Sequence, residues 1–538
     1  MNRAQKRAQE KAQKKQQQQM LSTAQGCNHV ALQLMQENPV QAHELFQRAI
    51  MMEPEPLAYW INYHEVLKRI QLKEAPQAIE KILVTKLDKP SPIADTLVNI
   101  AQFFVTINRQ IRESMALPAK EVINHPVKHP LLLTLLAHHI ITSPVLEQWL
   151  TKLRGKLLFS KLTEEQKRDW QEFLKALAAQ CFRNEYVFWQ SDEEIERVKA
   201  LNLRDEWEYS LAACYGPVDR KEQLQKEKEA AASIPRLTEI SDAVSQKVQE
   251  QYEENPYPRW DKMWLPEPRP VAEELQRILP EQPSSVFAGL SHPPQLLVAG
   301  CGTGKHAAQV AARYKDSQIV AVDLSSASLG YAKGKLEEHG FADRVELMQA
   351  DILELGKLDR QFDMIESTGV LHHMQDPIAG WKVLLSLLKP QGLMKIALYS
   401  ELARQLIVKA REIIAQKGYE PTPQGIRQCR RDMMLSPDAN ELAELVRMPD
   451  FYSLSECRDL IFHVQEHRYT IPQLQDILEE LSLEFLGFEH AMQVKDATYA
   501  EHYPHDRKQT NLNHWHELEQ RNSLLFYGMY QMWLRPKS

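Results

Sequence analysis

The sequence predicts an α/β protein in which an all-helical N-terminal region precedes a doubly wound, Rossmann-like sheet. Glycine marks the change, because three of the 18 glycines precede residue 286 and eleven fall between residues 289 and 392. From residue 296 onward, buried strands alternate with amphipathic helices, which is the pattern of a parallel sheet covered on both faces. A chain of 538 residues, 43% of them hydrophobic, is also long enough to fill more than one core.

Residues 1–20 are predicted to form a basic arm, disordered or helical, without the apolar run of a signal peptide. A basic arm could touch nucleic acid. The arm has no interleaved aromatic residues, however, and the chain has a formal net charge of -7, so specific nucleic-acid binding is not supported.

Residues 21–92 are predicted to form helical repeats. The pairs Gln41-Ala42 and Gln77-Ala78 lie 36 positions apart, close to the period of tetratricopeptide repeats. An all-helical domain follows at 93–235, with helices expected over 93–113, 130–160 and 164–203. A groove for a protein or peptide partner and simple packing between helices both remain open. The apolar run at 130–144 is too short to span a bilayer, so no membrane insertion is expected.

Residues 251–294 are predicted to form a linker and possible lid, because nine prolines lie between 255 and 294. Tyr252 and Arg259 belong to an unusually aromatic start of this segment. Arg259 could pair with a carboxylate of a bound cofactor, and Tyr252, Tyr257 or Trp260 could cover it. The alternative is an aromatic clasp that joins two domains.

Residues 296–323 combine a buried strand, a glycine turn, a helix and a second strand that ends in an acid, the parts of a nucleotide-type cofactor pocket. The glycines are Gly300, Gly302 and Gly304, and Lys305 stands where a dinucleotide fingerprint needs its third glycine. NAD is therefore not favoured. Asp323 is placed to accept hydrogen bonds from a ribose diol. In the alternative interpretation, a plain βαβ unit uses these glycines only for packing.

Further strands are expected over 344–355, 362–374 and 392–400, with a helix over 377–389. Because ligands bind at the carboxyl ends of parallel strands, the glycine turn, Asp323, Asp351 and the loop 366–373 should converge on one pocket. The predicted cofactor-binding core is 295–400. Residues 401–470 are predicted to be an inserted helical cap, and residues 471–538 the C-terminal end of the sheet.

The motifs VAGCGTG, VDLS, QADILEL and GVLHHM resemble those of class I S-adenosylmethionine-dependent methyltransferases. The resemblance implies a seven-stranded methyltransferase sheet and S-adenosyl-L-methionine as cofactor. It also implies that the glycine loop contacts the methionine part, Asp323 the ribose, and Asp351 with Ile352 the adenine. The full expected cofactor-binding set is Gly300, Cys301, Gly302, Gly304, Asp323, Leu324, Asp351, Ile352, Glu366, Tyr252 and Arg259.

Segments 251–260, 457–470 and 180–188 look like those of bacterial methyltransferases with tetratricopeptide-like N-terminal repeats. That resemblance names no methyl acceptor. A protein is slightly favoured over RNA or a small molecule, by analogy with peptide-binding repeats. The alternatives are a repeat-based scaffold with a non-catalytic cofactor domain and an oxidoreductase on the same sheet, which the glycine spacing and Asp351 oppose.

Catalytic residues are the least constrained part of the sequence. His372 and His373 follow the fourth strand, where one of them could remove a proton from the acceptor; in the resembled family this turn commonly shapes the cofactor pocket instead. The residues Arg458, His463, Glu466, His467 and Arg468 of the insertion could line an acceptor pocket or form a salt-bridged surface. Six cysteines show neither a C-x-x-C pair nor zinc-ligand spacing, so no metal and a reducing, cytoplasmic location are expected.

Overall fold

The computed structural model describes all residues except 1–18, 119–120, 219–220, 436–438, 490–495 and 538. The predicted arm at 1–20 lies outside the described residues, apart from its last two positions. Two compact units can be distinguished: Met1–Val218 with Arg447–Ser453, and Asp219–Val446 with Leu454–Ser538. Within the described parts, no helix combines the length and the apolar character needed to cross a membrane.

The described part of the first unit is helical, as predicted. Pro144 opens a helix with Ser143 as its cap, whose side chain accepts from the N–H of Leu146, so the run predicted over 130–160 is divided into two helices. The repeat segments carry helices of similar length, but their assignment to the tetratricopeptide family stays a prediction. The helices are α2 (Ala24–Leu34), α3 (Pro39–Met52), α4 (Leu57–Leu67), α5 (Gln77–Leu87), α6 (Ala94–Ile107), α7 (Arg109–Ala116), α8 (Pro130–His138), α9 (Pro144–Phe159), α10 (Glu164–Arg183), α11 (Asp192–Lys199) and α12 (Glu206–Ala213).

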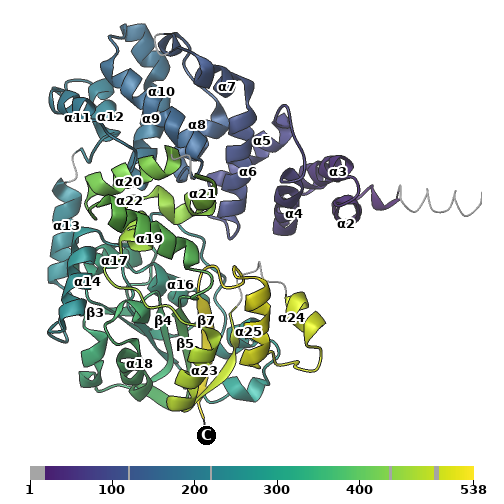
Figure 1. Ribbon diagram of the computed structural model, residues 1–538, viewed down its shortest axis with the longest axis vertical. Coiled ribbons are helices and arrows are strands. Elements are labelled where there is room, and N and C mark those ends of the chain that lie inside the picture. The colour runs from purple at the N-terminus through teal and green to yellow at the C-terminus, as the bar shows by residue number, and fades with distance from the viewer. Residues whose placement is uncertain (1–18, 119–120, 219–220, 436–438, 490–495, 538) are drawn as a thin grey trace, which may run out of the picture. The chain divides into compact units, whose positions relative to one another are not determined.

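The second unit is built on a seven-stranded sheet with the order β3-β2-β1-β4-β5-β7-β6 (Figure 1). Strands β1 to β5 are parallel, whereas β7 lies between β5 and β6 and runs antiparallel to both. The predicted doubly wound Rossmann-like sheet is thus confirmed. The strands are β1 (Gln295–Ala299), β2 (Gln318–Asp323), β3 (Val345–Gln349), β4 (Phe362–Thr368), β5 (Leu388–Leu398), β6 (Leu483–Phe488) and β7 (Tyr530–Pro536).

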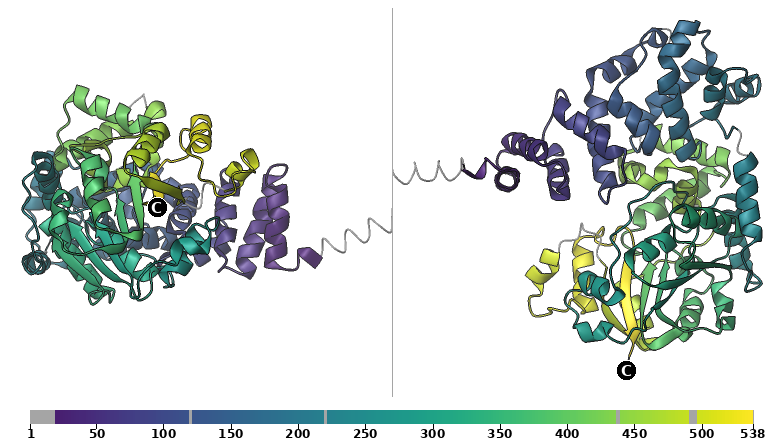
Figure 2. Two further views of the ribbon diagram at one scale, coloured as in Figure 1. Left: turned by 90° about the horizontal axis from the view of Figure 1, so that it is seen from below. Right: turned by 180° about the vertical axis from the view of Figure 1, so that it is seen from behind.

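Two hydrophobic layers cover the sheet, because neighbouring residues of a strand point to opposite faces. Leu296 and Val298 of β1 pack with α15 (Val271–Ile278), α16 (Lys305–Arg313) and α17 (Ser326–Glu338). Leu297 and Ala299 face the other layer, with α18 (Pro377–Ser386), α23 (Ile471–Glu480) and α25 (Leu512–Arg521). Figure 2, seen from behind, shows the yellow strand β7 beside the green strands of this sheet. The strand ends are thereby held between rigid layers.

The connection between the two predicted parts differs from the expectation. The sequence predicts a helical domain that reaches residue 235 and a linker over 251–294, yet the N-terminal stretch of the first unit ends at Val218. Helix α13 (Lys221–Ala232) packs on α17, so that a Cβ on Gly330 would lie 2.3 Å from the carbonyl oxygen of Glu227. Within 251–294, Trp260, Val271 and Leu275 are core residues of the second unit. This segment is therefore folded onto the sheet domain and is not a free linker.

The insertion after β5 is helical, with α19 (Gln405–Lys417), α20 (Pro423–Leu435), α21 (Ala439–Arg447) and α22 (Leu454–Phe462). A smaller correction concerns the end of α18, which was expected at residue 389. Leu388 pairs with Phe362 in the sheet, so the helix ends at Ser386 and β5 begins earlier than predicted.

Candidate functional site

The glycine turn after β1 leaves the strand through left-handed backbone that other residues rarely adopt. Gly300 has a φ of 80° and Gly302 a φ of 52°. A Cβ on Gly302 would lie 2.6 Å from the carbonyl oxygen of Tyr257, and one on Gly300 would lie 2.2 Å from Cγ2 of Val370. The turn leads directly into α16, whose first N–H groups have no partner within the helix. Glycine is therefore required here by both conformation and space.

Asp323, at the end of β2, holds this turn in place. Its Oδ2 accepts from the backbone N–H of Gly302 at 2.7 Å, and its Oδ1 accepts from that of Ser325 at 2.9 Å. Burial raises the pKa of the Asp323 carboxyl, and these backbone hydrogen bonds oppose the rise without cancelling it. A carboxylate has lone pairs left after two such bonds, so it can still accept from a ligand's hydroxyl groups.

Asp351 follows β3 and caps the short helix η3 (Ile352–Lys357), accepting from the N–H of Leu353 at 3.0 Å. Burial is the main cause that raises its pKa. Ser245 and Val248 of α14 (Ala243–Glu254) lie against the same end of the site. Asp351 thus provides a polar surface for a flat heterocycle, and Ile352 and Val248 provide an apolar one.

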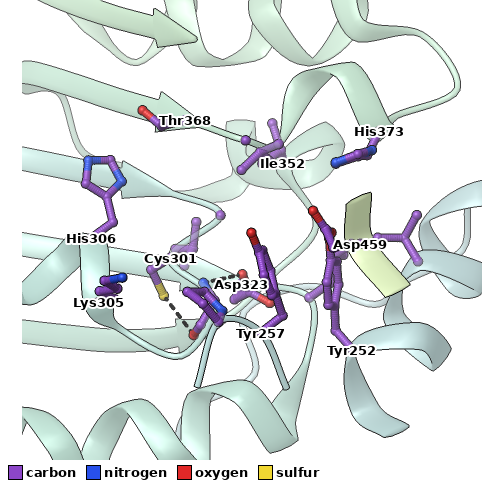
Figure 3. A pocket seen from close by; sticks show the side chains of 18 of the residues that line it. Tyr252, Tyr257, Cys301, Lys305, His306, Asp323, Ile352, Thr368, His373 and Asp459 are labelled. Carbon is purple, nitrogen blue, oxygen red and sulfur yellow. Dashed lines mark hydrogen bonds between the residues drawn. The ribbon is translucent and has the colours of Figure 1, made fainter. Parts of the chain in front are cut away.

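These groups meet in one cavity of about 490 Å³ at the carboxyl ends of the parallel strands. That volume is in the range of small-molecule and cofactor pockets. Figure 3 shows side chains that converge on it from the glycine turn, β2, η3, α14 and α22. The predicted residues that line the cavity are Gly300, Cys301, Gly302, Asp323, Leu324, Asp351, Ile352, Tyr252 and His373. Cys301 contributes a small buried side chain whose pKa is raised well above the usual value by burial, so it stays a neutral thiol.

The four other predicted site residues, Gly304, Glu366, His372 and Arg259, are not among the residues that line the cavity. Glu366 is buried in the middle of β4, where His306 donates to it at 2.9 Å. Burial alone would raise the pKa of Glu366, but this hydrogen bond and the charges of Lys395 and Arg313 bring it to about 2. Glu366 therefore does not reach the cavity itself but holds the side chain of His306, which lines the cavity.

The predicted contact of Arg259 with a cofactor carboxylate is not supported. Arg259 pairs with Glu227 at 3.8 Å, and its guanidinium lies 5.1 Å above the ring of Tyr331. The neighbouring Trp260 donates its indole N–H to the carbonyl of Thr303 at 3.0 Å. Residues 259 and 260 therefore contact other parts of the second unit, behind the glycine turn, while Tyr252 and Tyr257 line the cavity. A clasp that joins two domains stays a prediction.

Lys305 is the cation that the cavity offers instead. It opens α16, lines the cavity, and has no ion-pair partner among the described residues. Two other cationic side chains of the lining, Lys395 and Arg313, are engaged with Glu489 at 2.6 Å and 3.2 Å. Lys305 and the adjacent helix N-terminus together favour an anionic group of a ligand.

His372 and His373 lie in the short helix η4 (Leu371–His373), and both are buried. His373 donates from Nδ1 to the carbonyl of Gln465 at 2.7 Å and stacks on His463 with ring centroids 3.5 Å apart. Burial lowers the pKa of His373 to about 4 and that of His372 well below the usual value, so both rings are neutral at pH 7. Only His373 reaches the cavity.

The insertion contributes a residue that sequence reasoning missed. Asp459 of α22 lines the cavity, whereas Arg458, His463, Glu466, His467 and Arg468 do not. Tyr252 donates its hydroxyl to Oδ1 of Asp459 at 2.7 Å, and Nε2 of His463 lies 3.2 Å from the same hydroxyl. Asp459 is separated from Tyr252 by 207 positions, and no spacing in the sequence relates the two. Glu466 instead pairs with Arg404 at 2.5 Å.

His373, Asp459 and His463 also bring ring nitrogens and a carboxylate oxygen within 4.8 Å of one another, a geometry that a metal ion could use. The hydrogen-bond directions favour a proton network instead. Nδ1 of His463 accepts from the N–H of Gln465 at 3.1 Å, so the neutral ring carries its proton on Nε2 and offers no lone pair there.

Comparison with known proteins fits this geometry. Residues 296–392 match the family model described as a methyltransferase domain. An uncharacterized protein of Synechococcus sp. is 33% identical over 203 residues, which are 36% of this chain and 48% of the relative. A malonyl-(acyl-carrier protein) O-methyltransferase of Priestia megaterium is 37% identical over 97 residues, which are 18% of this chain and 34% of the relative. The chain thus spans half or less of the length of these relatives.

Among solved structures, a protein named PKMT2 from Rickettsia typhi, in complex with AdoHcy, has a TM-score of 0.38 and 17% sequence identity. The match covers 51% of this chain and 55% of that protein. The family match confirms the predicted S-adenosylmethionine-dependent methyltransferase at the level of the domain at 296–392.

Proposed function

With residues 296–392 as a methyltransferase domain, we propose that the chain transfers a methyl group from S-adenosyl-L-methionine to an acceptor. One observation supports this most directly. The cavity at the strand ends joins a glycine turn, two strand-end acids and a lysine at a helix N-terminus that forms no ion pair within the described part of the chain. Each of these groups suits a different part of that cofactor.

The residues of the cavity fit the cofactor. Asp323 accepts the ribose hydroxyls, and Asp351 with Ile352 holds the adenine. Gly302 leaves a cradle beside Tyr257 that a Cβ would fill, and this cradle receives the methionine part. Lys305, in place of the Arg259 expected from the sequence, pairs with the carboxylate of the methionine part.

The chemistry that the cofactor supplies when bound is a methyl group on a positively charged sulfur, which a nucleophile takes by direct displacement. The protein's part in such a reaction is mainly alignment and exclusion of water. Tyr252 and Tyr257 cover one side of the cavity, and the contact between Tyr252 and Asp459 ties this cover to α22. His373, held by Gln465, presents a neutral ring to the acceptor.

Among acceptors, a protein remains the favoured class, ahead of RNA and small molecules. The support is the presence of exposed apolar side chains at the two ends of α3 and at the start of α4. Val40 is 60% exposed, Met51 49%, Met52 44% and Leu57 38%. Exposed apolar side chains on helices can contribute contacts to a bound peptide. A cytoplasmic location is part of the same proposal, supported by six buried cysteines of which none forms a disulfide.

Calorimetry on the full chain tests the cofactor assignment. S-adenosylmethionine should release or absorb measurable heat, whereas NADH should not. The second test adds a labelled methyl donor to a cell extract, which is then separated into protein, RNA and small molecules. Label in the protein fraction supports the favoured acceptor. Tight cofactor binding without label in any fraction would instead favour a scaffold with a non-catalytic cofactor domain.

A further inference from the structure

The end of α14 and the segment after it contribute two aromatic side chains to the cavity, Tyr252 and Tyr257, which we call the aromatic pair. Their ring centroids lie 6.3 Å apart, and their planes differ by only 19°. Figure 3 shows both rings among the side chains that converge on the cavity. In the proposed function these tyrosines only cover the cavity, which an aliphatic side chain would do equally well.

Tyr257 is held against the glycine turn by its own backbone. A Cβ on Gly302 would lie 2.6 Å from the carbonyl oxygen of Tyr257, so the two backbones approach each other closely. Two hydrogen bonds fix the neighbouring residues, because the hydroxyl of Thr303 donates to the carbonyl of Pro258 and the indole N–H of Trp260 donates to the carbonyl of Thr303. The position of Tyr257 is therefore fixed relative to the glycine turn.

The glycine turn in turn meets the acid at the end of β2. The backbone N–H of Gly302 donates to Oδ2 of Asp323 at 2.7 Å, so the sites proposed for the methionine part and for the ribose adjoin each other. In S-adenosylmethionine a single sulfur atom joins these two parts. The sulfur is therefore expected where the two sites meet, beside Tyr257.

Tyr252 is an uncharged phenol close to the same point. Burial raises its pKa well above the usual value, the charge of Asp459 and the hydrogen bond to it add to the rise, and Tyr399 and Asp323 contribute less. The hydroxyl of Tyr252 donates to Oδ1 of Asp459 at 2.7 Å. Since that proton is engaged, the ring is the part of Tyr252 that is left to interact with a ligand.

A sulfonium ion is a cation that no hydrogen bond can recognise, because its sulfur carries three carbon substituents and no proton. Its charge is permanent and does not depend on pH. Aromatic faces attract such ions, because the π system is negative above and below the ring, and the attraction grows where water is excluded. After methyl transfer the sulfur is a neutral thioether, which the same faces no longer attract by charge.

We propose that Tyr252 and Tyr257 bind the sulfonium of S-adenosylmethionine through their ring faces, and that this contact makes the charged donor bind more tightly than the neutral product. The inference rests on the proposed methyltransferase function and assigns a site to one more group of the cofactor. It also has a consequence for turnover. A product that binds more weakly than the donor is readily displaced by it, so product inhibition stays weak while the donor is in excess.

Calorimetric titration of the full chain tests the contact with S-adenosylmethionine and S-adenosylhomocysteine, which differ only in the methyl group and the charge. Tyr257→Leu and Tyr252→Leu should each weaken the donor about tenfold, the size expected of a cation–aromatic contact shielded from water, and the product less than about twofold. Tyr257→Phe keeps the ring and should preserve the ratio of the two affinities. Tyr209→Leu, at an exposed position of α12, is the matched control and should change neither affinity.

A second test removes the charge attraction while nearly preserving the shape of the side chain. Replacement of Tyr257 by pentafluorophenylalanine reverses the sign of the potential at the ring face, and its reference is Tyr257→Phe. The donor should bind about tenfold more weakly to the fluorinated chain than to this reference, whereas the product should bind equally to both. This comparison decides the question even where a leucine variant does not fold.

Equal losses for donor and product, in either leucine variant or in the fluorinated chain, would overturn the proposal and leave the aromatic pair as a cover for the adenosine part. Unchanged affinities for both ligands would overturn it as well. In both cases the proposed function would stand, because the ligands still bind. A parent chain that binds neither ligand would instead overturn the proposed function.

Discussion

Replacement of Asp323 by alanine should weaken the binding of S-adenosylmethionine by at least 100-fold. The change removes the acceptor proposed for two ribose hydroxyls and also the anchor of the glycine turn, at 2.7 Å from the N–H of Gly302. A hydrogen bond to a charged group contributes about 1.5–3 kcal/mol, so two of them contribute about 3–6 kcal/mol. At about 1.4 kcal/mol per tenfold change, the lower figure already corresponds to about 100-fold.

The assay is calorimetric titration of the full chain, with the melting temperature as a control for folding. Asp323→Asn should weaken the binding of S-adenosylmethionine about tenfold, an effect between those of the parent chain and Asp323→Ala, because its amide oxygen still accepts one of the two backbone N–H groups. Asp343→Ala, at an exposed position before β3, should bind like the parent chain. If Asp323→Ala keeps an affinity within twofold of the parent with an unchanged melting temperature, the ribose assignment is wrong.

Three other changes test separate parts of the site. Gly302→Ala should abolish cofactor binding and lower the melting temperature, because the new Cβ would lie 2.6 Å from the carbonyl oxygen of Tyr257 at a φ of 52°; normal binding would contradict the cradle. Lys305→Met should weaken S-adenosylmethionine about tenfold but leave its decarboxylated analogue unaffected, and an equal loss for both would rule out the carboxylate contact. Because the pKa of His373 is lowered from 6.5 to about 4, this histidine binds a proton less readily in the folded chain than in the unfolded chain. The contribution of His373 to the free energy of unfolding is therefore complete above pH 6.5 and is lost as the pH falls toward 4. His373→Gln should therefore remove about 2 kcal/mol of the stability loss between pH 7.5 and pH 5 in urea unfolding, and an unchanged loss would place the titration elsewhere.

The part of the site whose residues lie close together in the chain can be predicted from the sequence. Strand, glycine turn, helix and acid lie within 28 consecutive positions, so their order alone fixes how Gly302 and Asp323 meet. Asp351 can be predicted for the same reason, because it directly follows the next parallel strand, β3. The fold follows too, since alternating strands and helices leave few ways to build a sheet.

The other half depends on contacts that no spacing encodes. Asp459 reaches Tyr252 only because the insertion after β5 packs against α14. Arg259 illustrates the reverse case. Its position in an aromatic segment predicts a ligand contact, but its guanidinium pairs with Glu227 and lies over the ring of Tyr331. Lys305 stands where a dinucleotide fingerprint needs its third glycine, and only the structure shows that this residue lines the cavity.

The position of β7 in the sheet has a consequence for how the chain folds during synthesis. Strands β1 to β5 are complete by residue 398, but β6 can join them only through β7, which spans Tyr530–Pro536. Until the ribosome has released that segment, the edge of β5 exposes unpaired backbone along an apolar strand, which is a template for aggregation. A nascent chain of this protein therefore has to protect one sheet edge while more than 130 further residues emerge, and chaperones that cover exposed strands should associate with it during that interval.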